Sequence, residues 1–153
     1  MRILVLSDSH NDYLSLKKAV ETHPTAEVVV FLGDGERDLD RIDDALQLKH
    51  VIKVKGNCDI ASELNENVVQ TICTKKFFIT HGYVENVKFG IDRLVYKGQS
   101  LDADIILYGH THTPVNKYID GVYVFNPGSI RDGNYGFIDI TDKGEVMCVN
   151  AEI

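Results

Sequence analysis

Five short apolar runs in this chain each end at a side chain that can bind a metal ion. Runs of Val, Ile, Leu and Phe bounded by glycine and polar residues are typical of buried strands. In open α/β sheets, ligands collect beyond the carboxyl ends of the strands. The five runs lead to Asp8, Asp34, Asn57, His81 and His110. The pattern therefore predicts an α/β fold in which five strand ends build one polar site.

The side chains at these five positions are carboxylates, imidazoles and one amide, with no thiolate among them. This donor set suits one or two divalent ions such as Mn, Fe, Zn, Ni or Co. His10 and His112 extend the series, because they follow Asp8 and His110 by two residues. A lone Asp-x-His is more often a turn or a helix cap, so the inference depends on the whole series. His23 lies outside it and is interpreted as structural.

Three of the candidate ligands directly follow a glycine, in the pairs Gly33-Asp34, Gly56-Asn57 and Gly109-His110. Glycine leaves space for a close approach of the backbone to an ion or a phosphate. Each of these glycines taken alone is equally compatible with an ordinary loop.

The N-terminal half alternates between strand and helix patterns. A first strand is expected to end near Leu6, with further strands over 28–32 and 51–55 and helices over 13–21 and 37–46. This order is a βαβαβ unit. The acid-rich stretch 36–44 is interpreted as the solvated face of the second helix rather than as another cation site.

The second half of the chain is expected to contain several strand pairs. The runs 68–72 and 77–80 flank a turn at 73–76, and a short helix over 91–98 leads to a strand at 105–108. Further along, Asp120-Gly121 and Lys143-Gly144 separate apolar runs and indicate two hairpins. We expect the C-terminal third to form a predominantly antiparallel second sheet packed on the first, within one domain spanning 1–153.

Composition excludes several classes of protein. The 153 residues are 44% hydrophobic and 25% charged, and no apolar stretch approaches the roughly 20 residues of a membrane span. The net charge of −7 argues against an electrostatic grip on a nucleic-acid polymer, which needs clustered Lys and Arg. The three cysteines show no CxxC spacing, which favours a reducing cytoplasm over a disulfide framework.

Taken in order, the motifs DSH, GD, GNCD, THG and GHTH resemble those of the calcineurin-like metallophosphoesterases, in particular the small bacterial and archaeal phosphodiesterase branch. The resemblance runs from Asp8 to the NPGS segment at 126–129. Single motifs of this kind are common, whereas five in the right order are specific. The resemblance implies an α/β (α+β) fold of two stacked mixed β-sheets flanked by helices, a four-layer αββα sandwich.

By position, the resemblance assigns seven ligands to two divalent ions: Asp8, His10 and His112 to the first, Asn57, His81 and His110 to the second, and Asp34 between them. A carboxylate has two oxygens and can span ions roughly 3.5–4 Å apart. The implied reaction is hydrolysis of a small phosphodiester by a hydroxide that bridges the ions, with Asp34, Asn57 and His81 also acting in catalysis. Manganese is favoured, and Fe, Ni, Zn and Co are the alternatives.

Three further residues have two interpretations each. Many family members carry a histidine after the Asn, placed to protonate the leaving oxygen, but here Cys58 follows it. A neutral thiol is a weak donor, so Cys58 is either a poor acid or a packing residue. Arg131 is either a bidentate phosphate contact or a partner of Asp132. Asp59 either orients a ligand or is a surface acid.

Three functions are open at this point. The first is a metal-dependent phosphodiesterase, and the second is a protein-binding scaffold similar to the metallophosphoesterase-like subunit of retromer. The third is a phosphatase acting on phosphomonoesters or phosphoproteins. Complete ligands favour an enzyme, because motif positions are partly degraded in the scaffold branch. The physiological substrate, the native metal and the oligomeric state, a homo-oligomer included, are left open.

Overall fold

A computed structural model describes all residues 1–153 and contains two five-stranded sheets. The first sheet has the strand order β10-β9-β1-β2-β3; its strands in chain order are β1 (Arg2–Leu6), β2 (Val28–Phe31), β3 (His50–Lys53), β9 (Asn134–Ile140) and β10 (Val146–Glu152). The second has the order β4-β5-β6-β8-β7; its strands are β4 (Asn67–Ile72), β5 (Lys75–Thr80), β6 (Ile105–Leu107), β7 (Val115–Ile119) and β8 (Val122–Asn126).

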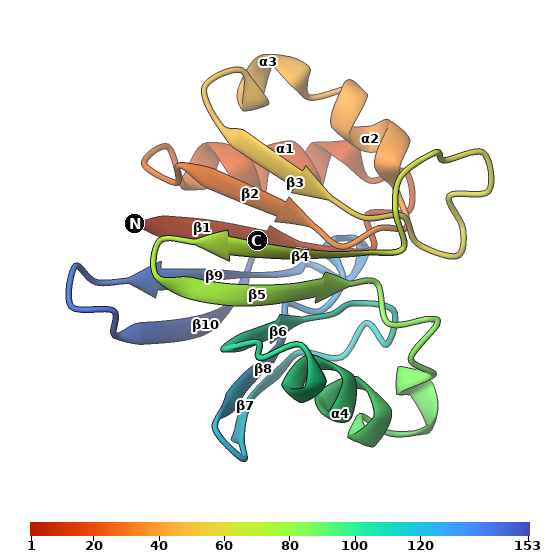
Figure 1. The fold of residues 1–153 in the computed structure, drawn as a ribbon. Helices are drawn as coiled ribbons and strands as arrows, with labels where there is room; N and C mark the ends of the chain where they lie inside the picture. The colour runs from red at the N-terminus through yellow and green to blue at the C-terminus, as the bar shows by residue number, and fades with distance from the viewer.

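Helices cover the outer face of each sheet (Figure 1). The first sheet carries α1 (Tyr13–Thr22), α2 (Glu36–Asp40) and α3 (Asp43–Leu46), and the second carries α4 (Asp92–Ser100). Two short 3-10 helices, η1 (Val87–Phe89) and η2 (Ile130–Asp132), lie in the connecting loops. None of the helices combines the length and apolar character needed to cross a bilayer. The expected αββα sandwich is confirmed.

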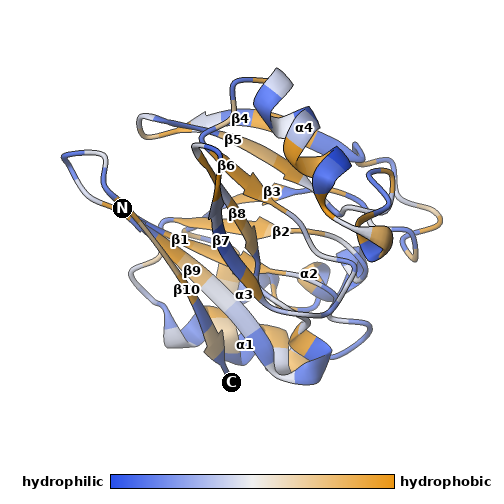
Figure 2. Cartoon of the chain, turned by 90° about the horizontal axis from the view of Figure 1, so that it is seen from below, coloured by the Kyte–Doolittle hydropathy of each residue, from blue (hydrophilic) through white to orange (hydrophobic).

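Strand alternation explains the layers. On β1, Ile3 and Val5 join the apolar cluster between the sheets, whereas Leu4 and Leu6 join the cluster beneath α1 to α3. Successive side chains of a strand point to opposite faces, so a strand buried on both faces is apolar throughout. A third cluster fills the space between the second sheet and α4. Figure 2 shows apolar residues concentrated in the central strands, with helices that are partly hydrophilic.

The strands that carry the site are parallel within each sheet. β1 pairs in parallel with β2, and β2 with β3. In the second sheet β5 pairs in parallel with β6, and β6 with β8. Parallel neighbours end at the same edge of a sheet, so the loops that follow them gather at one end, as Figure 1 shows for the loops after β2, β3 and β5.

The expectation for the C-terminal third was wrong. Its two hairpins do not form a sheet of their own: β7 and β8 join the second sheet, and β9 and β10 join the first. β9 pairs antiparallel with β1, which completes the first sheet. Turn residues specify a hairpin locally, but the sheet edge that a hairpin joins depends on contacts distant in the sequence.

The helix expected over 37–46 is divided into α2 and α3 by Arg41 and Ile42. Ile42 is 0% exposed and belongs to the cluster under the helices, so packing interrupts the helix there. The interpretation of 36–44 as a solvated face was also wrong at Asp38. Its side chain is buried and accepts hydrogen bonds from Ser9 Oγ at 2.6 Å and Asn11 N at 2.9 Å. It therefore fixes the loop around His10.

Candidate metal centre

The seven expected ligands come together at the end of the molecule where the parallel strands stop. Asp8 and His10 follow β1, Asp34 follows β2, and Asn57 follows β3. His81 follows β5 directly, while His110 and His112 lie in the loop after β6. Three overlapping groups of possible metal ligands result: a first of Asp8, His10 and His112; a second of Asp34, His81 and His110; and a third of His10, Asp34 and Cys58.

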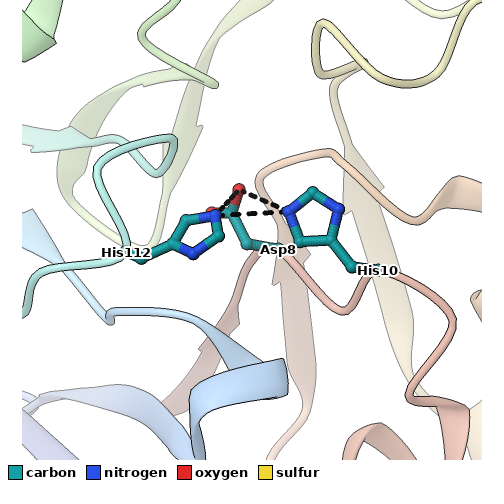
Figure 3. Close-up of side chains that lie close together, drawn as sticks. All are labelled: Asp8, His10 and His112. Atoms are coloured by element: carbon teal, nitrogen blue, oxygen red, sulfur yellow. Dashed lines mark hydrogen bonds and ion pairs between the residues drawn. The ribbon is translucent and has the colours of Figure 1, made fainter.

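The first group surrounds one oxygen of Asp8 (Figure 3). Asp8 Oδ1 lies 3.2 Å from His112 Nε2 and 3.7 Å from His10 Nε2, and the two imidazole nitrogens are 3.2 Å apart. Asp8 is 0% exposed, and its Oδ1 accepts no hydrogen bond. Its Oδ2 accepts from Ser7 Oγ and His110 N. A buried carboxylate oxygen without a donor is costly, and a cation between it and the imidazoles would satisfy it.

The second group is built around His81. Its Nδ1 lies 2.7 Å from the carbonyl oxygen of Leu32, which can only accept, so Nδ1 carries a proton. In the neutral ring Nε2 is then a lone-pair donor to a metal. Nε2 lies 3.1 Å from Asn57 Oδ1 and 3.1 Å from His110 Nδ1. Acceptor atoms that face one another at this distance need a proton or a cation among them.

Asp34 lies between the two groups. Its Oδ2 is 3.4 Å from His81 Nε2 and 3.9 Å from His10 Nε2, and its Oδ1 accepts a hydrogen bond from Cys58 N at 2.7 Å. Burial opposes ionisation of Asp34, but the hydrogen bond and charge of His81 and the Cys58 amide outweigh it and hold the pKa below its usual range. Asp34 is therefore an anion at neutral pH.

The two histidines of the second group respond differently to this surrounding. Burial lowers the pKa of His81, but the nearby Asp34 and Asp8 carboxylates overcome it and leave the pKa raised. Burial, with the positive charges of His81 and Lys88, lowers the pKa of His110 to about 4. The His81 imidazole thus attracts a proton at a place where a metal cation would also be stabilised. The His110 imidazole stays neutral, which is the form that binds a metal.

Backbone strain is concentrated at the same residues. Among non-glycine residues with positive φ are five of the seven candidate ligands: Asp8 (54°), His10 (44°), Asp34 (59°), His110 (67°) and His112 (58°). The left-handed region costs a residue with a Cβ roughly 1–3 kcal/mol, and such residues cluster at functional sites. The loops are therefore shaped to direct these side chains inward at the expense of local stability.

The glycines before the ligands provide the space that the sequence predicted. A Cβ on Gly56 would collide with the backbone nitrogen and side chain of Asp34. A Cβ on Gly109 would collide with the side chains of Ser7 and Asp8. Close packing between loops, rather than approach to a ligand alone, makes glycine necessary at these two positions.

Asp59 is the residue that connects two of the loops. Its carboxylate accepts four backbone hydrogen bonds, from Asp34 N (2.8 Å), Gly35 N (2.9 Å), Glu36 N (3.0 Å) and Gly56 N (2.8 Å). Of the two interpretations of Asp59, the orienting one agrees with these contacts. The loop that carries Asp34 is thereby joined to the loop that carries Asn57.

Supporting residues that sequence reasoning missed lie at the end of β8 and in the segment that follows it. Asn126 donates from Nδ2 to Gly109 O at 3.0 Å and to Thr111 Oγ1 at 3.1 Å, and so holds the GHTH loop. Ser129 Oγ donates to Asp8 O at 3.0 Å. Asp132 Oδ2 lies 3.3 Å from His112 Nδ1. The NPGS segment was visible in the sequence, but its role in holding other loops was not.

Cys58 and Arg131 differ in how they relate to the site. Cys58 is exposed and groups with His10 and Asp34, and burial together with the Asp34 charge raises the pKa of its thiol to about 11. Arg131 is exposed and its side chain forms no ion pair, since Asp132 faces His112 instead. Its backbone amide lies 3.3 Å from Asp8 O. Its role at the phosphate stays a prediction.

The donor atoms fit divalent cations. Two buried carboxylates, four histidines and one amide oxygen converge around Asp34, with too few hydrogen-bond donors among them to satisfy every acceptor. Hard and intermediate divalent ions prefer such oxygen and imidazole ligands. Fold and site together define an αββα protein with a metal-binding centre where both sheets end.

The family model for the calcineurin-like phosphoesterase superfamily domain matches residues 1–143, and the chain belongs to this superfamily. It is 34% identical to the probable metallophosphoesterase YsnB of Bacillus subtilis, over 86% of this chain and 76% of that protein. It is 28% identical to the phosphodiesterase YfcE of Escherichia coli, over 98% and 93%. The structure of wild-type Vps29 from Entamoeba histolytica, complexed with Zn²⁺, matches with a TM-score of 0.72, 26% identity and 99% coverage of both chains.

Proposed function

We propose that this protein is a phosphodiesterase that uses two divalent metal ions. Asp8, His10 and His112 would hold one ion, and Asn57, His81 and His110 the other, with Asp34 shared between them. Membership of the phosphoesterase superfamily and the likeness to YfcE support this activity. The observation that carries the proposal is the convergence of acceptor atoms, with Asp8 Oδ1 left without a hydrogen bond.

When bound, the ions would lower the pKa of water for attack on phosphorus and neutralise charge on the phosphoryl oxygens. The chain itself sets the charge and the orientation of the ligands. Asp34 stays ionised because His81 and the Cys58 amide stabilise its charge. Leu32 O fixes the tautomer of His81 so that Nε2 faces the site. The oxygen and imidazole donors suit divalent transition ions, among which we favour Mn²⁺ as the native ion.

Two cavities next to the ligands support a diester rather than a monoester. One, of about 220 Å³, is lined by Asn57 and His81. The other, of about 640 Å³, is lined by His10, Asp34 and Cys58. Residues of the loop after β3 line both cavities. A phosphodiester carries two substituents, and one cavity is available for each.

The scaffold function is the main alternative. The structural likeness to Vps29 is compatible with it, because the fold is the same. A scaffold has no need of seven converging ligands or of strained backbone at five of them. The complete site therefore favours the enzyme.

The decisive experiment combines metal analysis with turnover. Protein purified without chelator should contain two divalent ions per chain and hydrolyse bis(p-nitrophenyl) phosphate faster than p-nitrophenyl phosphate. Chelator should abolish turnover, and Mn²⁺ should restore it best. Asp34→Asn should lose nearly all activity, whereas Asp43→Asn on the exposed start of α3 should retain it. A protein with at most one tight ion, or with full activity in chelator, would contradict the proposal.

A further inference from the structure

The smaller cavity, of about 220 Å³, has a partly apolar wall beside the candidate metal ligands. The loops after β3 and β5 contribute Ile60 and Tyr83 to its lining, together with Asn57 and His81. Ile60 is 95% exposed and Tyr83 is 57% exposed. Exposed apolar residues scattered singly need no explanation, but two that line one cavity at a polar site indicate ligand binding.

The loop that carries Tyr83 is anchored by hydrogen bonds of a buried neighbour, Glu85. Glu85 is 3% exposed, and its carboxylate accepts hydrogen bonds from Thr80 Oγ1 at 2.9 Å and Lys97 Nζ at 2.7 Å. The Gly82 amide also lies 3.2 Å from Thr80 Oγ1. A buried carboxylate is tolerated only when it is paired and hydrogen-bonded. These contacts anchor the residues on both sides of Tyr83, whose side chain stays exposed.

The Tyr83 ring is oriented as well as exposed. It meets the His110 ring edge to face, with ring centroids 5.5 Å apart and an interplanar angle of 84°. Such an arrangement is the favourable one for aromatic pairs, and a tyrosine with few rotatable bonds loses little entropy on binding. Tyr83 is therefore a preorganised aromatic surface at the border of the candidate metal centre.

The lining of the cavity carries one cation, Lys55, and two carboxylates, Asp59 and Glu66, of which Asp59 accepts four backbone hydrogen bonds. Lys55 forms no ion pair, whereas the neighbouring Lys53 pairs with Glu36 at 3.6 Å. Glu66, also in the lining, is likewise free of an ion pair. Lys55 is thus available to the negative charge of a phosphodiester, next to Asn57.

We propose that this cavity binds one substituent of the substrate, and that the substituent is a flat aromatic ring lying between Ile60 and Tyr83. The inference rests on the proposed function and names the substrate class of the same site. Its size agrees, because a cavity of about 150 Å³ holds a benzene ring. An aryl group and a nucleobase share this chemistry.

The test compares two ligands with the same phosphonate group, one carrying a phenyl ring and the other an ethyl group. Phenylphosphonate and ethylphosphonate carry the same anionic group, and neither has an ester bond to hydrolyse. Calorimetry on the Mn²⁺-loaded protein should show phenylphosphonate binding about tenfold more tightly, because the ring buries more apolar area and stacks against an aromatic side chain. Thymidine 5′-phosphate and 2-deoxyribose 5-phosphate, compared in the same way, show whether a nucleobase gains as much as a phenyl ring.

Variants separate the ring from the metal site. Tyr83→Ala should reduce the phenyl preference to about twofold or less, and Tyr83→Phe should keep the preference. Ile60→Ala should reduce it in part and provides a second variant on the opposite loop. Phe89→Ala is the matched control, because Phe89 is 93% exposed but lines a different cavity.

The outcomes distinguish this inference from the proposed function. Metal-dependent binding of ethylphosphonate with no gain from the ring, or a gain that survives both Tyr83→Ala and Ile60→Ala, would overturn the inference and leave the proposed function standing. Failure of the metal-loaded protein to bind either phosphonate would overturn both.

Discussion

Asp59 orders two loops with a single carboxylate. Three of its four hydrogen bonds come from consecutive amides at Asp34, Gly35 and Glu36, and the fourth comes from Gly56. Asp34 has a positive φ of 59°, a conformation that needs support from its surroundings. We infer that Asp59 is a positioning residue, which acts on the metal centre through the backbone of Asp34.

Replacing Asp59 by Asn should weaken metal binding and turnover together. The amide keeps one acceptor oxygen but brings an NH₂ group against backbone N–H donors. Losses of about 10–100-fold are typical when a residue that orients metal ligands is changed. Titration of Mn²⁺ and kcat/KM for an aryl diester measure both effects. Asp142→Asn, in the exposed turn before β10, should behave as wild type. Unchanged metal affinity in Asp59→Asn would refute the positioning role.

Cys58 should be unreactive in the metal-free protein although it is exposed. Partial desolvation of its sulfur and the nearby Asp34 carboxylate raise the pKa of the thiol to about 11. Only the thiolate is alkylated, so at pH 8 a fraction of about 10⁻³ is available. The rate of iodoacetamide labelling in chelator should rise about tenfold per pH unit from 8 to 10. Cys73, which is exposed far from the ligands, is the internal comparison. Labelling that levels off near pH 8.5 would contradict the raised pKa.

The candidate ligands could be predicted from sequence because five of them end an apolar run or follow a glycine, and His10 and His112 lie two residues beyond Asp8 and His110. Their supporting contacts could not. Asp132 faces His112 from 20 residues further along the chain, and Asn126 reaches back to Gly109. Such contacts between distant residues depend on the arrangement of the strands, and no local sequence pattern predicts them. Asp38 was misjudged for the same reason, since its burial depends on the loop around His10.

At the scale of elements, the positions of the strands were easier to predict than their pairing in the sheets. The apolar runs that became β1, β2 and β6 are buried on both faces, which the sequence shows directly. The hairpin β9–β10 was also visible, but its pairing with β1 was not. α1 was predicted close to its observed bounds, and Asp12 caps it by accepting from Ser15 N at 3.1 Å.

His23 links α1 to β9 and should make stability depend on pH. It follows the last turn of α1, is 8% exposed, and its Nε2 lies 3.0 Å from the Tyr135 hydroxyl. Burial lowers its pKa in the folded protein, and the charge of Arg2 adds to this. Between that lowered value and about 6.5 the unfolded chain binds more protons. The free energy of unfolding should therefore fall as pH decreases below about 6.5.

The measurement is denaturant unfolding of the chelated protein between pH 5 and 7.5. His23→Gln should show a shallower dependence on pH than wild type, since the titrating group is gone. His50→Gln, at an exposed position at the start of β3, should leave the slope unchanged. The histidines among the candidate metal ligands contribute equally to the pH dependence of all three proteins. The difference in slope between wild type and His23→Gln therefore reports on His23 alone. Identical slopes for wild type and His23→Gln would show that His23 is not responsible.

At the scale of the whole molecule, the candidate metal ligands come from both sheets. Asp8, His10, Asp34 and Asn57 come from loops of the first sheet, and the remaining ligands from loops of the second. Bound ions would thus add contacts across the main interface of the fold. An ion that binds only the folded chain stabilises it by about 2.7 kcal/mol at a concentration 100 times its Kd.

Each Mn²⁺ ion bound at that concentration should raise the Tm by roughly 5–11 °C, given about 2–4 °C per kcal/mol for a protein of this size. Asp8→Asn should act in opposite directions with and without metal. In chelator it removes a buried charge whose Oδ1 has no hydrogen bond, and should be neutral or stabilising by about 1 kcal/mol. With Mn²⁺, the Asp8→Asn variant should show much less of the metal-dependent stabilisation than wild type, because one charged ligand is missing. Asp43→Asn should match wild type in both conditions. A uniform loss of stability in Asp8→Asn, unaffected by metal, would mean that Asp8 serves the fold and does not bind the ion.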